Sequence, residues 1–128
     1  MELRRHFTGT RWETAVGYCR AVRAGNLIFV SGTAPVSEDG GTYAPYDGYA
    51  QARRCFEIVQ QALAALEADL ADVVRTRMFV TDLDQFEAIT RAHREFFGEH
   101  PPASTLVEVK GLVNPDMVIE VEVDAVAG

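Results

Sequence analysis

Residues 117–126 alternate strictly between two kinds of side chain, and this pattern constrains the fold more than any other. Every second position is apolar: Met117, Ile119, Val121, Val123 and Ala125. The positions between them include three acids, Glu120, Glu122 and Asp124. Because successive side chains of a β-strand point to opposite faces, the pattern predicts a strand with one buried face and one charged face. Such a strand needs a second layer to cover its apolar side.

Two segments with helical periodicity supply that layer. Residues 47–68 carry an apolar stripe at spacings of three and four, and Asp47 can cap the helix at its start. The stripe consists of Tyr49, Ala52, Phe56, Val59, Leu63 and Leu66. A second helix is predicted over residues 84–97, ended by Gly98. On its apolar side lies His93, which we interpret as a hydrogen-bonded core or interface histidine rather than a metal ligand.

Four further strands are predicted, over residues 18–22, 27–31, 73–80 and 103–109, with a turn at Gly25-Asn26 between the first two. The order is a hairpin, the long helix, a strand, the second helix and two strands. It predicts an α+β fold in which both helices pack on one face of a single sheet. With 128 residues, the chain forms one domain, 1–128.

The other face of the predicted sheet carries charge. Arg75 and Arg77 share a face of one strand, and Tyr18 and Arg20 share a face of the hairpin. If these faces coincide with the acids of the last strand, arginines and acids pair across strands. A face that mixes aromatic, charged and apolar groups is typical of a subunit interface, and a solvated face is the alternative.

Composition excludes several classes of partner. Twelve basic and nineteen acidic residues give a net charge of −7, which argues against nucleic acid and anionic membranes as partners. No apolar run reaches the roughly 18 residues of a membrane span, and the first residues lack the apolar core of a signal peptide. Cys19 and Cys55 form no motif and predict free thiols. We therefore expect a cytoplasmic protein.

The chain has few groups that could hold a metal or a cofactor. His6, His93 and His100 are scattered, and no glycine-rich phosphate loop or nucleophile elbow occurs. We therefore expect neither a metal nor a cofactor. For acid–base chemistry the candidates are Glu120 and Glu122, because a carboxyl group at a partly dry interface has a raised pKa. Simple pairing of both acids with arginines is the alternative.

Several segments resemble, in the same order, the Rid family, also called YjgF or reactive-intermediate-deaminase proteins. Residues 17–26 resemble its hairpin motif GPYSQAV with a Gly-Asn turn, and residues 28–35 resemble the strand ending in SGQxP. The start of its long helix is matched around Gln51. Residues 74–83 resemble VVKTTVFVTDL, residues 95–104 resemble FF…PAR, and residues 119–127 resemble the closing strand IEIEAIA. The likeness runs from about residue 15 to residue 128.

This resemblance implies a chorismate-mutase-like α+β fold that assembles as a homotrimer, with a small-molecule cleft between each pair of subunits. It also implies hydrolysis of reactive imines and enamines to a 2-oxo acid and ammonia. In the family an arginine grips the substrate carboxylate, and a glutamate on the last strand helps to place the water. A bidentate arginine supplies both charge and orientation for such a carboxylate.

Carried over by position, the family's glutamate is Glu120 and its tyrosine is Tyr18. The strand-end pair is Ser31-Gly32, a helix asparagine of the cleft falls on Thr90, and the hairpin glutamine is Arg20. The carboxylate-binding arginine is replaced by Ser104, which has no cationic group. The neighbouring Thr105 offers a hydroxyl. The resemblance is thus to a branch that lacks the arginine.

Two functions remain open at this point. The first is an imine or enamine hydrolase with a non-standard substrate, in which either Arg20 supplies the cation or the substrate has no carboxylate. The second is a non-catalytic trimer that binds a small metabolite in the same cleft. A ribonuclease, as some relatives are labelled, is disfavoured by the negative charge. We favour the enzyme because Glu120 and Tyr18 are both present.

Overall fold

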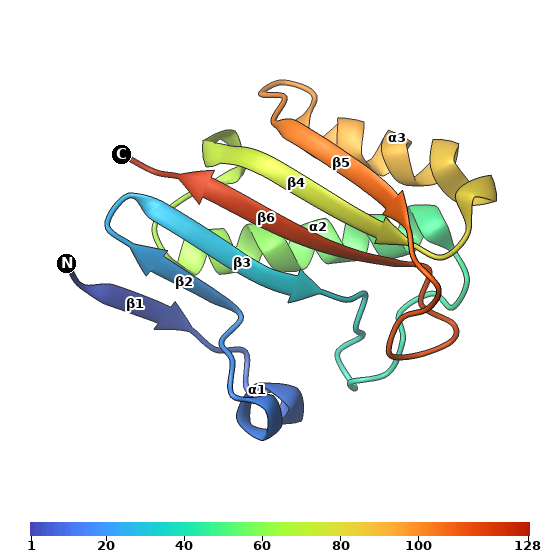
Figure 1. Cartoon of the computed structure of the whole chain (residues 1–128), viewed down its shortest axis with the longest axis horizontal. Coiled ribbons are helices and arrows are strands. Elements are labelled where there is room, and N and C mark those ends of the chain that lie inside the picture. The colour runs from blue at the N-terminus through green and yellow to red at the C-terminus, as the bar shows by residue number, and fades with distance from the viewer.

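The computed structural model describes all residues from 1 to 128 and contains one six-stranded sheet with the order β1-β2-β3-β6-β4-β5 (Figure 1). The strands are β1 (Leu3–His6), β2 (Ala21–Ala24), β3 (Leu27–Thr33), β4 (Val73–Val80), β5 (Ala103–Glu108) and β6 (Ile119–Val126). The helices are α1 (Arg11–Val16), α2 (Gly48–Ala65) and α3 (Phe86–Phe97), with 3₁₀ turns at Leu70–Asp72 and Leu83–Gln85. Neighbouring strands are antiparallel except β4 and β5, which are parallel.

Helices α2 and α3 lie behind the sheet and cover one of its faces (Figure 1). The apolar positions of β6 point into this layer, where Ile119, Val121 and Val123 are fully buried with Phe56 and Leu63 of α2. Each such side chain contributes about 1.5–3 kcal/mol through burial. The predicted α+β architecture and the alternation of the last strand are therefore confirmed. None of the helices has the length and hydropathy needed to cross a bilayer.

The N-terminal region differs from the prediction. Strand β1 and helix α1 were not predicted, and β2 begins at Ala21 rather than at residue 18. The reason lies at the end of α1, where Gly17 adopts a left-handed conformation with φ 92°. The backbone N–H groups of Gly17 and Tyr18 both donate to the carbonyl of Glu13, so the chain turns here. Tyr18 and Arg20 consequently precede β2, and the prediction that they share a strand face is wrong.

Other boundaries follow local chemistry. The predicted cap at Asp47 is confirmed, since its side chain accepts a hydrogen bond from the backbone N–H of Ala50 at 3.0 Å. The Gly25 turn is confirmed by a φ of 62°. Strand β6 begins at Ile119, two residues later than predicted. Cys19 and Cys55 are free, as expected, and Cys55 is buried on α2, which raises the pKa of its thiol.

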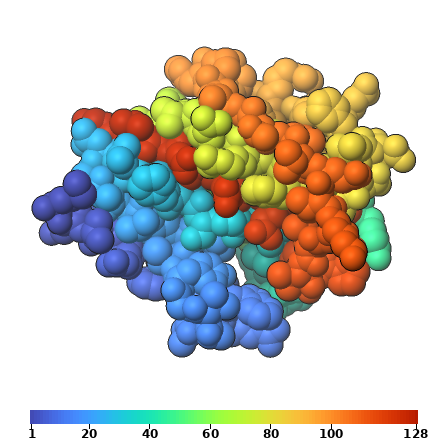
Figure 2. All heavy atoms as spheres, in the orientation of Figure 1, coloured from blue at the N-terminus to red at the C-terminus, as the bar shows by residue number.

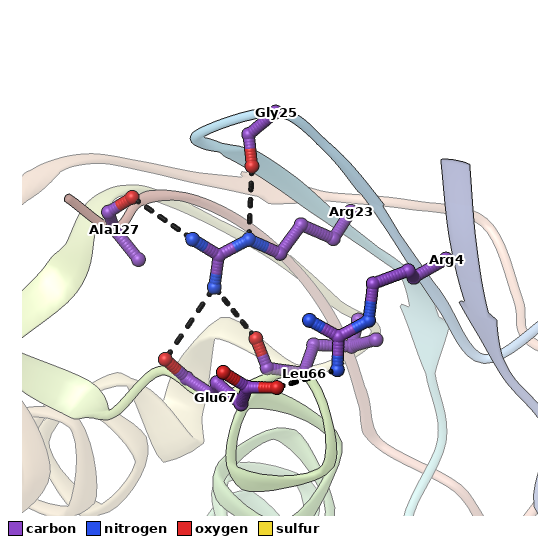
Figure 3. Close-up of polar contacts among 6 residues, drawn as sticks. All are labelled: Arg4, Arg23, Gly25, Leu66, Glu67 and Ala127. Atoms are coloured by element: carbon purple, nitrogen blue, oxygen red, sulfur yellow. Dashed lines mark hydrogen bonds and ion pairs between the residues drawn. The ribbon is translucent and has the colours of Figure 1, made fainter. Parts of the chain in front are cut away.

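The end of α2 is held by one arginine of β2 (Figure 3). Arg23 donates hydrogen bonds to the carbonyl oxygens of Leu66 at 2.7 Å, Ala127 at 3.1 Å and Gly25 at 2.9 Å. A cation at the carboxyl end of a helix satisfies carbonyls that have no partner within the helix. Arg23 therefore joins the first hairpin, the end of α2 and the end of β6 at one point.

Candidate functional site

Glu120 projects from the face of the sheet that no helix covers. It is paired in register with Phe79 of β4, and its carboxylate lies directly over Gly32 of β3. A Cβ atom at Gly32 would collide with Oε2 of Glu120, so the close approach requires glycine. The pairing of β3 with β6 shifts register between Val30 and Thr33, and this irregularity places Gly32 beside Glu120.

Arg20 is the buried cation of this region, with only 8% of its surface exposed. Its Nη2 atom donates to the carbonyl oxygen of Gly32, its Nε atom has no hydrogen-bond partner, and its guanidinium carbon lies 5.6 Å from the ring centre of Tyr18. Ser31 holds the adjacent backbone, because its hydroxyl donates to the carbonyl of Cys19 at 2.7 Å. We call Tyr18, Arg20, Ser31, Gly32 and Glu120 the carboxylate cluster.

The electrostatics of the cluster set the proton affinity of Glu120. Burial raises the pKa of its carboxyl group, Arg20 lowers it, Glu122 raises it, and the result lies above the ordinary value. The other two acids of β6 share one cation, since Nη1 of Arg77 lies 3.1 Å from Asp124 and 3.7 Å from Glu122. This confirms the predicted cross-strand pairing for Arg77, whereas Arg75 forms no ion pair. Glu120 takes part in no ion pair, so its carboxyl group is free to exchange a proton.

Ser104 lies at the other face of the sheet, on the edge strand β5. It is in register with Thr76 of β4, whose hydroxyl donates to Oγ of Ser104 at 2.7 Å. The same Thr76 oxygen lies 2.8 Å from Nε2 of His93 on α3. The imidazole packs against the rings of Phe56 and Phe97, at 5.6 and 4.8 Å between ring centres. We call Ser104, Thr76 and His93 the hydroxyl chain.

Two further predicted site residues join neither group. The hydroxyl of Thr90 on α3 donates to the carbonyl of Phe86 at 2.8 Å, one turn earlier in the same helix. Thr105 is in register with Arg77 and points to the face opposite that of Ser104.

Figure 2 shows the face without helices, across which β3, β6, β4 and β5 run side by side. Within one chain the sheet therefore separates Glu120 from Ser104.

The prediction did not include Thr76 among the candidate residues, and it gave His93 only a structural role. The pattern did contain a signal for both. Thr76 is the one polar residue among the buried positions of β4, and His93 is the one polar residue on the apolar stripe of α3. Two lone polar groups on facing apolar surfaces need each other as partners. The structure contains no group of three His, Cys, Asp or Glu side chains arranged to hold a metal ion.

Comparison with known families gives a match over nearly the whole chain. The family model described as Endoribonuclease L-PSP matches residues 8–127. The 2-iminobutanoate/2-iminopropanoate deaminase of Escherichia coli K12 is 38% identical over 116 residues, which cover 88% of this chain and 89% of the deaminase. The 3-aminoacrylate deaminase RutC of Acinetobacter baylyi is 35% identical over 104 residues, or 81% of this chain and 82% of RutC.

Solved structures show the same fold. Rv2704 of Mycobacterium tuberculosis, a member of the YjgF/YER057c/UK114 family, superposes with a TM-score of 0.90 at 36% identity, covering 98% of this chain and all of Rv2704. E. coli TdcF, solved with bound serine, superposes with a TM-score of 0.82 at 30% identity, covering 97% of this chain and 94% of TdcF. The sheet and the two helices behind it are therefore those of this group of proteins.

Proposed function

Because this chain belongs to the endoribonuclease L-PSP family, the family of the YjgF and RutC proteins, we propose that it hydrolyses reactive imines and enamines to a carbonyl compound and ammonia. The observation that carries the proposal is the position of Glu120, a partly buried carboxyl group with a raised pKa, seated on Gly32 and facing Arg20. A carboxyl group with a raised pKa is a candidate for taking up and releasing a proton during a reaction.

The proposed reaction consumes one water and needs no cofactor. Glu120 takes a proton from the water while the water oxygen bonds to the imine carbon, and the proton passes to the imine nitrogen. The resulting amino alcohol then loses its C–N bond, with the hydroxyl proton moving to the departing nitrogen, so that ammonia and a C=O group are formed. An enamine enters the same route after protonation of its carbon gives the imine. Tyr18 orders the cleft in this scheme.

We propose that the complete site lies between two copies of the chain in a homotrimer. The separation of Glu120 from Ser104 by the sheet supports this, because one chain cannot present both to one small molecule. The exposed apolar residues of the uncovered face support it as well, since Phe29 is 44% exposed and Leu27 is 46% exposed. The proposed setting is the cytoplasm, where amino-acid-metabolising enzymes release imines.

The substrate differs from that of arginine-containing relatives in this proposal, because Ser104 stands where the carboxylate-binding arginine is expected. Either Arg20 supplies a cation instead, or the substrate has no carboxylate. The guanidinium of Arg20 is buried, and its Nη2 atom is already engaged by Gly32. This arrangement favours a role for Arg20 beside Glu120 over direct binding of a substrate carboxylate.

The second candidate function is binding of a small metabolite without turnover, in the same intersubunit cleft. It is favoured by the absence of a cation at Ser104, since a scaffold that has lost its substrate clamp keeps its fold and its cleft. The two functions differ in one observable, which is the release of ammonia.

The test is to add the purified protein to imines produced in place by an amino-acid oxidase or a flavin amine oxidase and to measure ammonia. We expect faster release than in buffer, and Glu120→Gln to lower the rate by about 10²–10⁴-fold. Glu122→Gln is the matched control on the same strand face and should keep most of the rate. Light scattering must show the same assembly for all three proteins. No acceleration with any imine would leave the binding function as the better account.

A further inference from the structure

The hydroxyl chain runs from the core to the surface of the edge strand β5. Thr76 has no exposed surface, His93 is partly buried, and Ser104 is exposed. A threonine hydroxyl has a single hydrogen to donate. Because the Thr76 oxygen has two partners, His93 Nε2 at 2.8 Å and Ser104 Oγ at 2.7 Å, the directions of the two hydrogen bonds are coupled.

The coupling allows two arrangements. When Nε2 of His93 carries the proton, it donates to Thr76, Thr76 donates to Ser104, and the Ser104 hydroxyl donates outward. When the proton is on Nδ1 instead, Thr76 donates to Nε2, Ser104 donates to Thr76, and the Ser104 oxygen accepts from outside. The imidazole tautomer therefore determines whether Ser104 offers a donor or an acceptor.

The hydroxyl chain carries no charge. No charged side chain forms a hydrogen bond or an ion pair with Ser104, Thr76 or His93. Burial lowers the pKa of His93, which favours the neutral imidazole at neutral pH. A carboxylate placed against Ser104 would lose water without meeting a cation, which is unfavourable. An imine C=N–H group has both a lone pair and an N–H, so it would find a hydrogen-bond partner at Ser104 in either arrangement, and a carbonyl oxygen would find one when Ser104 donates outward.

We propose that Ser104 is the specificity-determining residue of the cleft, and that it selects imines and enamines that have no carboxylate by hydrogen bonding to an uncharged polar group. Thr76 and His93 are positioning residues that orient its hydroxyl. This inference rests on the proposed hydrolase function and names the substrate class of the same site. It does not involve Arg20 as a substitute cation.

The experiment compares two imines: one released by a flavin amine oxidase from a primary amine without a carboxyl group, and one released by an amino-acid oxidase from alanine. We expect the wild-type protein to favour the uncharged imine. Ser104→Ala and Thr76→Val should each lower kcat/KM for it by about 10-fold, the loss of one buried hydrogen bond. The double variant should lose no more than either single variant, because both changes break the same chain.

Conservative variants separate positioning from folding. Thr76→Ser keeps the hydroxyl and should retain most of the rate, whereas Thr76→Val keeps the shape of the side chain and should not. Ser104→Arg should reverse the preference toward the carboxylated imine by at least about 10-fold, since it restores the guanidinium. Independent losses that multiply in the double variant, or a wild-type preference for the carboxylated imine, would overturn the inference.

If the wild-type protein hydrolyses neither imine, the proposed function fails and the inference is judged by binding alone. The probes are then acetamide and acetate, titrated while the His93 imidazole is followed by nitrogen NMR. Preferential binding of acetamide, abolished by Thr76→Val and kept by Thr76→Ser, supports recognition of an uncharged group by the hydroxyl chain. Preferential binding of acetate, or no response at His93 to either probe, contradicts it.

Discussion

The carboxylate cluster and the hydroxyl chain are two groups of polar residues that lie at opposite faces of one sheet. In the first, burial raises the pKa of the Glu120 carboxyl group, and in the second, burial lowers the pKa of the His93 imidazole. The shifts have opposite signs, yet each favours the uncharged form. Only Glu120 has a cation near it, Arg20, whose charge lowers the pKa of the carboxyl group and so opposes the effect of burial. The same physical cause thus raises the pKa of an acid on one face and lowers the pKa of a base on the other.

The largest effect is expected from a variant that displaces the side chain of Glu120 and leaves its carboxyl group chemically unchanged. Gly32→Ala places a Cβ against Oε2 of Glu120, so the carboxylate must move. We expect the rate of imine hydrolysis to fall by about 10²-fold, the effect of misplacing a catalytic group by roughly 1 Å. Gly111→Ala is the control, because a Cβ there meets nothing within 4 Å.

Steady-state kinetics and thermal unfolding of both glycine variants provide the measurement. Unchanged kinetics for Gly32→Ala in a folded protein would show that the position of the Glu120 carboxylate does not matter. The hydroxyl chain should be unaffected, so the relative preference between the two imines should stay as in the wild type.

A smaller effect is expected when the charged partner is removed. Arg20→Gln takes away the positive charge that lowers the pKa of Glu120, so that pKa rises further. In the proposed reaction the ionised carboxylate acts on the water, so the acidic limb of the kcat/KM profile should move to higher pH. Profiles between about pH 4 and pH 9 measure it. Arg75→Gln, on the same uncovered face and outside every ion pair, should leave the limb in place. A limb that moves to lower pH would mean that Arg20 does not act on Glu120.

The smallest effect is expected from a change at Glu13, whose backbone carbonyl accepts a hydrogen bond from the N–H of Tyr18. The Glu13 carboxylate accepts hydrogen bonds from Thr8 N at 3.0 Å, Gly9 N at 3.3 Å and Thr10 Oγ1 at 3.2 Å. Burial raises the pKa of this carboxyl group, but these bonds and one from the Thr8 hydroxyl outweigh burial, and the pKa lies below its ordinary value. Glu13→Gln should cost about 1–2 kcal/mol of unfolding free energy at pH 7.

The sign of the pH dependence follows from that lowered pKa. The stabilisation by Glu13 is complete above the pKa of an unfolded glutamate, about 4.3, and is lost as the pH falls through the lower folded value. Urea unfolding at equal protein concentration should therefore separate wild type from Glu13→Gln at pH 7, and the difference should narrow as the pH falls below about 4. The exposed Glu99→Gln should match the wild type at pH 7. A gap that persists in acid would point to packing instead of hydrogen bonding.

The features predicted correctly are those that depend on a local repeat or on neighbouring residues in the sequence. The alternation of 117–126, the apolar stripe of α2 and the cap at Asp47 each depend on residues within a few turns of one another. Strand β1 was missed because its four residues, three of them Arg or His, carry no alternation, and edge strands of this length depend on their neighbour. Helix α1 has only six residues, too few for a stripe.

The site was predicted only in part for a different reason. The family motif identified Tyr18, Gly32 and Glu120, but not the turn that places Tyr18, since that depends on the backbone of Glu13. The hydroxyl chain joins residues 76, 93 and 104, which lie on three separate elements. Contacts of this kind depend on strand register and helix packing, which no single stretch of sequence contains.

The order of the sheet also determines when the fold can be completed during synthesis. Strand β6 is the last of the six to be made, yet it lies between β3 and β4 (Figure 1). Until residues 119–126 leave the ribosome, the β1-β2-β3 unit and the β4-β5 pair each present an open edge and share no hydrogen bonds. The fold therefore closes in one late step across long sequence separations, and a nascent chain that stalls before this strand is exposed to edge-to-edge aggregation.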